Sequence, residues 1–213
     1  MLSTCLASGP PTWQRVGVSA PSTRRIGAED SKTRAQLVDA AELVLLEEGY
    51  AAVTSRRVAA RAGLKPQLVH YYFRAMDDLF LEVFRRRADE NLARFEREIA
   101  AEPTLRTLWR FNADQRGAVF TIEFAALANH RKAIRAEVAR YAERYRRAQL
   151  AALAAMPAGR RIAEVGLPPD AVLLLMTGVT QVLGLERALG MTTGHQATLD
   201  FIDGAVADLE APT

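Results

Sequence analysis

The sequence predicts an all-α protein, with a small N-terminal helix-turn-helix domain followed by a larger helical domain. From Ser31 onward apolar residues recur at helical spacing, and no alternating run of β-branched residues favours a strand. Two very short helices are expected back to back within 54–73, on either side of Gly63. The chain has 213 residues, 49% of them hydrophobic, which is enough for a small domain joined to a larger one.

The N-terminal domain is expected at 31–75, after a tail (1–30) whose Pro, Ser, Thr and Gly content predicts flexibility. Its first helix has an apolar stripe and ends at Gly49, which is suited to a left-handed cap. Thr54 is the expected N-cap of the second helix, and Pro66 suits the first turn of the third. The stripe consists of Leu37, Ala41, Val44 and Leu45.

The larger domain is expected at 76–213 and is predicted to consist of long helices separated by Pro and Gly. The predicted helices are 76–100, 103–115, 117–129, 131–156, 168–190 and 195–209. The most apolar window, 171–185, is shorter than the roughly 20 residues of a membrane-spanning helix, so it is expected to be a buried helix.

Charge and cysteine content point to a cytoplasmic protein that can bind a polyanion. Residues 1–75 contain ten Lys or Arg and six Asp or Glu, whereas 150–213 contain three and seven. Cys5 is the only cysteine, which excludes an internal disulfide and fits a reducing compartment. The N-terminus lacks the pattern of a signal peptide, and no cofactor or metal is expected.

The third helix of this domain, which is short, is expected to have two chemically different faces. Val69, Tyr72 and Phe73 would pack inward, while Gln67, His70 and Tyr71 would point outward. Glutamine can bond base edges in a DNA major groove, and Lys, Tyr and His can bond phosphates. A polar helix face that is merely solvated is the alternative. The candidate DNA-binding residues are Lys32, Arg34, Thr54, Ser55, Arg56, Lys65, Pro66, Gln67, His70 and Tyr71.

The segment TSRRVAARAGLKPQLVHYYFRAMDDLFLEVF (54–84) resembles the N-terminal domain of the TetR family of bacterial transcriptional regulators. The matching positions are Thr54, Val58, Ala59, Ala62, Gly63, Leu64, Tyr72, Phe73, Asp78 and Leu79. Lys65, the order His70-Tyr71, and Met76 depart from the usual family pattern. The resemblance implies a homodimer that binds a roughly palindromic double-stranded operator, associates with the bacterial nucleoid, and responds to a small-molecule effector. A repressor released by its ligand is expected, although some relatives activate or respond in the opposite way.

In the family, the helices after the DNA-binding domain enclose the effector, and the last two long helices form the dimer interface. Here these helices are 168–190 and 195–209, and the stripe of Ala197, Phe201, Ala205 and Leu209 is expected to face a second copy. An apolar or aromatic effector is the default. The candidate effector-binding residues are Trp109, Asn112, Phe120, Glu123, Phe124, Thr177 and Gln181.

Several alternatives accompany these expectations. Glu123 is expected to pair with an arginine more readily than with a ligand, and Arg24 and Arg25 are candidates for an arm that reaches the minor groove. An enzyme is the main rival class, but the sequence has no Gly-rich phosphate loop, no Gly-x-Ser-x-Gly elbow and no metal-spaced His/Cys/Asp cluster. A helical interaction module is the other rival.

Overall fold

A computed structural model describes residues 32–211, apart from the side chains of residues 115, 116 and 118. Arg24, Arg25 and Cys5 therefore lie outside the described residues. All regular structure within the described range is helical, as predicted. The elements are α1 (Lys32–Glu48), the short 3-10 helix η1 (Tyr50–Ala52), α2 (Ser55–Ala62), α3 (Pro66–Tyr72), α4 (Met76–Ala101), α5 (Leu105–Asn112), α6 (Gln115–His130), α7 (Lys132–Ala155), α8 (Pro157–Glu164), α9 (Pro169–Ala188) and α10 (His195–Glu210).

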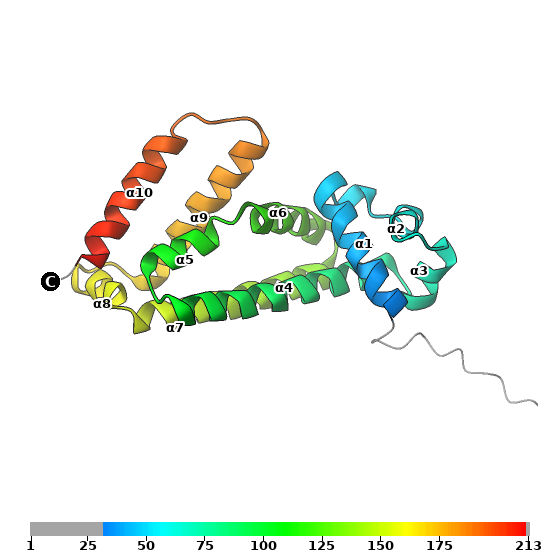
Figure 1. The fold of residues 1–213 in the computed structure, drawn as a ribbon, viewed down its shortest axis with the longest axis horizontal. Helices are drawn as coiled ribbons and strands as arrows, with labels where there is room; N and C mark the ends of the chain where they lie inside the picture. Colours follow the sequence, from blue (N-terminus) through cyan, green and yellow to red (C-terminus); the bar gives the residue numbers. More distant parts are fainter. Residues whose placement is uncertain (1–31, 212–213) are drawn as a thin grey trace, which may run out of the picture.

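The molecule is elongated, with α1, α2 and α3 grouped at one end (Figure 1). The long helices α4 and α7 pack against each other along its length, and α6 lies on α7 between the two ends. Helices α8, α9 and α10 and the C-terminus lie at the opposite end. Helix α4 begins directly after α3, so the smaller domain is continuous with the scaffold of the larger one.

Two apolar clusters hold these ends together. The first joins α1–α3 to α4, α6 and α7, and it includes Phe80, Phe84, Phe120 and Phe124. The second joins α4, α5, α7, α8, α9 and α10 around Phe95, which is 2% exposed. Because the first cluster crosses from the N-terminal domain into the larger domain, these two parts of the chain share one core.

Two local expectations were wrong. The segment beginning at Pro157 was predicted to be a break, but it forms helix α8, because proline fits the first turn of a helix and Ile162 is buried. Gly49 does not take the left-handed cap conformation: its φ of 83° is positive, but its ψ is 165°. The chain extends there before turning into η1.

Helix α9 is less buried than the sequence suggested. Within the described range it is the one helix long and apolar enough to cross a membrane by length and composition, which is weak evidence for a span because core helices pass the same test. It packs against α5, α6, α7 and α8, yet its opposite side is bare. The exposed large side chains on it are Leu174, Leu175, Val182 and Leu185, and Leu189 at its C-cap is exposed as well.

Candidate DNA-binding surface and effector cavity

Local capping interactions fix the pair of short helices α2 and α3. Thr54 is the N-cap of α2, as predicted, and its hydroxyl accepts a hydrogen bond from the Arg57 N–H at 3.2 Å. Gly63 ends α2 in the left-handed conformation with φ 67°, which glycine adopts without steric cost. The Leu64 N–H then bonds the Ala59 carbonyl at 2.8 Å, closing the turn. Pro66 begins α3.

Helix α3 has the two faces that its sequence predicts. Val69 and Phe73 are buried, at 1% and 2% exposure, and Tyr72 packs beside them. Lys65, Pro66, Gln67 and His70 are exposed, and Tyr71 is 45% exposed. The residues with hydrogen-bonding capacity for bases and phosphates therefore lie on one accessible surface, and the apolar face anchors the helix to the core.

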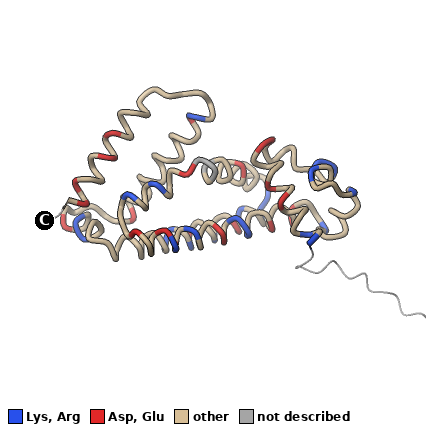
Figure 2. Tube along the Cα trace, viewed as in Figure 1, with Lys and Arg blue, Asp and Glu red and all other residues tan. Residues whose placement is uncertain are grey.

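The charges around this surface are arranged so that several cations remain available. The acidic residues of α1 are paired internally: Arg57 binds Glu48 and Arg61 binds Glu47. Most basic residues of the N-terminal domain lie at the end of the molecule, whereas its acidic residues lie on the side that faces the larger domain (Figure 2). The exposed cations of this domain that no described ion pair engages are Lys32, Arg56, Lys65 and Arg74.

Arg34 is the exception among the expected DNA contacts. Its guanidinium donates to Glu82 of α4 at 2.6 Å and lies 5.2 Å from the centre of the Phe73 ring. Only 15% of its side chain is exposed. Arg34 therefore fastens α1 to α3 and α4, and the structure does not support a contact with DNA. Thr54 is also engaged in capping, whereas the remaining expected residues are exposed or, for Ser55, half-buried.

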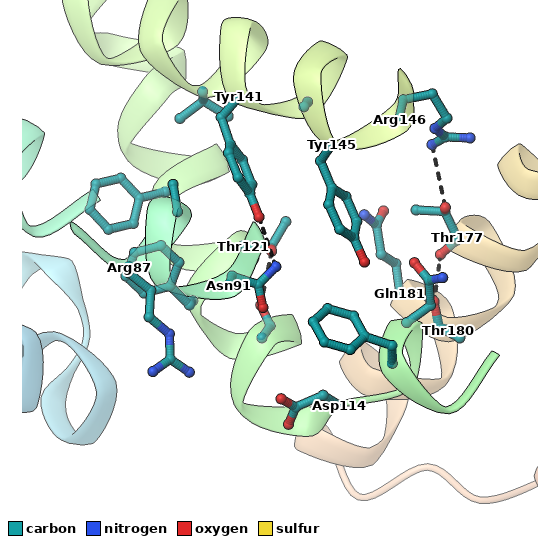
Figure 3. Close-up of a pocket in the computed structure, with 18 of the residues that line it drawn as sticks. Arg87, Asn91, Asp114, Thr121, Tyr141, Tyr145, Arg146, Thr177, Thr180 and Gln181 are labelled. Carbon is teal, nitrogen blue, oxygen red and sulfur yellow. Dashed lines mark hydrogen bonds between the residues drawn. The ribbon is translucent and has the colours of Figure 1, made fainter. Parts of the chain in front are cut away.

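The larger domain contains a cavity of about 230 Å³ between α4, α5, α6, α7 and α9. Five of the seven expected effector residues line it, namely Asn112, Phe120, Phe124, Thr177 and Gln181. The view into the cavity shows Tyr141 and Tyr145 hanging from α7 over its middle, with Asn91 on one side and Thr177, Thr180 and Gln181 on the other (Figure 3). The sequence therefore predicted five residues of this cavity but not most of its polar lining.

Two of the seven expected effector residues lie elsewhere. Trp109 is buried beside Leu183 and Leu199 at a separate hollow of about 20 Å³, because the cavity side of α5 is occupied by Phe111 and Asn112. Glu123 faces η1, where its carboxylate accepts a hydrogen bond from the Tyr50 N–H at 2.7 Å. No described arginine forms an ion pair with Glu123, so the expected arginine partner was wrong and a backbone N–H takes its place.

The polar groups in the cavity are oriented by their neighbours. The Asn91 amide donates to the Tyr141 hydroxyl at 2.7 Å, and the Gln149 amide donates to Asn112 Oδ1 at 2.9 Å. Burial raises the pKa of both the Tyr141 and Tyr145 hydroxyls, so both stay protonated and neutral at physiological pH. The cavity therefore presents neutral hydrogen-bonding groups between aromatic walls.

The residues that sequence reasoning missed had left a detectable signal. Gln149 continues the buried stripe of Tyr141 and Tyr145 by one further turn, and it is only 1% exposed. Asn91 lies on the same face of α4 as Phe84 and Phe95, two buried phenylalanines. A polar residue that interrupts an apolar stripe needs a partner, and here the partners line a cavity.

The chain is similar in sequence to known bacterial regulatory proteins. Residues 37–83 match the profile described as bacterial regulatory proteins, tetR family. Over 156 residues, which cover 66% of this chain and 74% of the relative, the chain is 34% identical to the HTH-type transcriptional regulator BetI of Rhizobium meliloti (strain 1021). The chain belongs to the TetR family. Membership of this family indicates a transcription factor and not an enzyme.

Solved structures share the TetR-family architecture of this chain. The transcriptional regulator SCO7518 of Streptomyces coelicolor A3(2) is 25% identical, with a TM-score of 0.53 over 85% of this chain and 100% of that chain. A regulator from Saccharomonospora viridis, solved in complex with choline, is 18% identical, with a TM-score of 0.67 over 80% of this chain and 95% of that chain. The helix-turn-helix domain followed by a helical domain is therefore a shared fold.

In this TetR-family chain, the cavity and the DNA-binding domain share buried aromatic side chains. Phe84, Phe120 and Phe124 line the cavity and also belong to the apolar cluster that supports α1, α2 and α3. The rings contact each other, with centroids 4.6 Å apart between Phe120 and Phe124. The cavity wall and the core that supports α1, α2 and α3 therefore share these three rings.

Proposed function

We propose that the chain is a transcriptional repressor that binds a palindromic operator as a homodimer and is released by a small apolar or aromatic effector. The observation that carries the DNA-binding part is the exposed face of α3, with Lys65, Gln67, His70 and Tyr71 outside and Val69 and Phe73 inside. Gln67 is assigned to a base edge, and Lys65 and Tyr71 to phosphates.

Exposed apolar side chains on α9 and α10 support the homodimer. Phe201 on α10 is 76% exposed, and Leu174 and Leu175 on α9 are 63% and 68% exposed. Water-exposed apolar side chains in this number favour association, and a second copy supplies a matching surface. The dimer would present two α3 helices about 34–36 Å apart, which is one turn of DNA.

Effector release follows from the connection between the cavity and the DNA-binding domain. A ligand that binds better to a conformation with a different α3 separation must weaken operator binding by the same factor. Phe84 on α4 and Phe120 and Phe124 on α6 are the contacts through which this coupling would act. The Saccharomonospora viridis regulator, which shares this fold, was solved in complex with choline, and this supports a small-molecule ligand for the fold.

Gel-shift titration of operator fragments, selected from genomic DNA, tests the assignment. Gln67→Ala should reduce the preference for the selected sequence over a scrambled one, by about 1–3 kcal/mol if a bidentate base contact is lost. Lys65→Ala and Tyr71→Ala should weaken binding to both sequences alike, and Lys65→Ala should lower the salt slope by about one.

Arg160→Ala is the matched control, because Arg160 is an exposed arginine on α8 at the far end of the molecule. It should leave both affinities unchanged. Equal losses for Gln67→Ala, Lys65→Ala and Tyr71→Ala on the two sequences would contradict the assignment of base readout to α3.

A further inference from the structure

The cavity has two chemically different ends. Its apolar end is formed by Phe84, Phe120 and Phe124, which lie together in the first core cluster. Its polar end is formed where α7 meets α5 and α9, and Figure 3 shows Arg146, Thr177, Thr180 and Gln181 close together there. An occupant that matches both ends must be amphipathic.

Arg146 differs from the other arginines of α7. Within α7, Arg140 pairs with Glu137, Arg144 with Asp89 and Arg147 with Glu143, and Arg135 donates to two carbonyls at the end of α6; Arg131, the N-cap of α7, pairs with Asp77. Arg146 donates only to the Thr177 hydroxyl, at 3.3 Å. Within the described part of the chain, it therefore lines the cavity without a carboxylate partner, although a guanidinium offers several N–H donors.

The hydroxyl next to Arg146 is fixed as an acceptor on that side. The Thr177 O–H donates to the Leu173 carbonyl at 2.8 Å, so the Thr177 oxygen offers its lone pairs to Arg146 and holds the guanidinium at the cavity edge. Gln181 follows Thr177 by one turn and lines the cavity, and its side chain forms no hydrogen bond with the described residues. Both arrangements leave N–H donors at this end for an incoming acceptor.

A cationic occupant is less well matched. The one carboxylate among the described lining residues is Asp114, which accepts a hydrogen bond from Arg94 at 2.6 Å. The Arg94 guanidinium in turn lies 4.5 Å from the centre of the Phe111 ring. Of the three described arginines that line the cavity, Arg87 pairs with Glu42 and Arg94 with Asp114, so Arg146 is the one whose charge no described carboxylate balances, and this charge favours an anion.

We propose that the effector is a small organic acid, whose carboxylate binds Arg146 and whose apolar body packs against Phe84, Phe120 and Phe124. This inference rests on the proposed function, since it names the chemical class of the effector for the same cavity. A carboxylate accepts two hydrogen bonds from one guanidinium, and such charge-assisted bonds are about twice as strong as neutral ones. The volume of about 230 Å³ suits one ring with a short chain.

Three probes of nearly equal shape test the charge preference. They are 4-phenylbutanoate, its amide 4-phenylbutanamide, and (3-phenylpropyl)trimethylammonium. Binding to the full-length protein, without DNA, is measured by calorimetry at neutral pH. The acid should bind about tenfold or more tightly than the amide, and the ammonium probe should bind most weakly.

Substitutions on α7 then locate the preference. Arg146→Gln should reduce the ratio of acid to amide affinity to about one, whereas Arg146→Lys should retain part of it. The matched control is Arg147→Gln, because the neighbouring Arg147 side chain is 79% exposed and lies 3.9 Å from Glu143. It should leave the ratio unchanged, and circular dichroism verifies that each variant is folded.

The proposal is overturned if the amide or ammonium probe binds as tightly as the acid, if no probe binds at millimolar concentration, or if Arg147→Gln acts like Arg146→Gln. Operator binding by the same variants is measured separately, with and without the acid. An acid that binds through Arg146 but never releases DNA would contradict effector release and leave the ligand class standing. DNA release by all three probes, whatever their charge, would support effector release and contradict the organic-acid class of ligand.

Discussion

At the scale of single residues, Glu123 illustrates how one side chain joins the two domains. Its carboxylate lies on α6 and accepts the Tyr50 N–H of η1 at 2.7 Å, close to Gly49. The backbone at Gly49 has φ 83°, so the chain turns away from α1 there and aims this N–H at α6. A buried backbone donor needs an acceptor, and Glu123 is placed to provide it.

We therefore expect Glu123→Ala to lower the free energy of unfolding by about 1–3 kcal/mol, because it leaves the Tyr50 N–H without its acceptor. Glu123→Gln keeps a carbonyl oxygen and should cost less. Urea denaturation measures both changes. Glu90→Ala, on the exposed side of α4, is the control and should change stability by no more than about 0.5 kcal/mol. Equal effects of Ala and Gln at position 123 would contradict the role of the hydrogen bond.

The residue scale is also where prediction from sequence was least complete. The unusual position of Glu123 among apolar residues was evident, but its partner was a backbone group of another segment, which no side-chain pattern reveals. Trp109 and Phe111 are both aromatic residues of α5, and only packing decides that Phe111 faces the cavity and Trp109 does not. Arg34 was predicted to bind DNA, and the sequence did not reveal that Glu82, 48 residues away, is its ion-pair partner.

At the scale of elements, helix α8 is held in place by a very close approach of two backbones. A Cβ added to Gly159 would overlap the carbonyl oxygen of Leu153 in α7. Leu153, Met156 and Ile162 are all buried at this junction, and the close approach of the two helices leaves no room for a side chain at Gly159. Glycine is required because the neighbour is backbone, which cannot rotate away as a side chain would.

Gly159→Ala should therefore destabilise the protein by about 1–3 kcal/mol, through strain at the junction of α7 and α8. Thermal unfolding followed by circular dichroism measures this effect. Gly204→Ala in α10 provides the comparison, since its added Cβ would meet open space within the chain and alanine favours a helix. If Gly159→Ala proved as stable as the parent, the tight junction would be refuted.

Elements were predictable where local chemistry decides them. Thr54, Gly63 and Pro66 mark the limits of α2 and α3 by capping and by restricted dihedral angles, and the structure has the helices at those limits. Helix α8 was missed because Pro157 and Gly159 are signals of a break when taken alone. Its stability comes from tertiary burial of Ile162, which overrides local propensity.

At the scale of the whole molecule, the expected dimer makes a direct prediction. Phe201→Ser should shift the protein from dimer toward monomer, because it removes the most exposed large apolar side chain of the predicted interface. Light scattering across a concentration series measures the change. Leu43→Ser, at a residue of α1 that is 44% exposed, should leave the mass unchanged. A parent protein that is monomeric at micromolar concentration would contradict the proposed assembly.

The double membership of Phe84, Phe120 and Phe124 limits how the regulator can diversify. Since these rings pack in the core that supports the DNA-binding domain and also line the cavity, replacing one of them changes the packing of both. Arg146, Thr177 and Gln181 line the cavity but do not belong to that core cluster. Substitutions of the polar residues on α7 and α9 can therefore change the ligand specificity of the cavity while the aromatic wall stays the same.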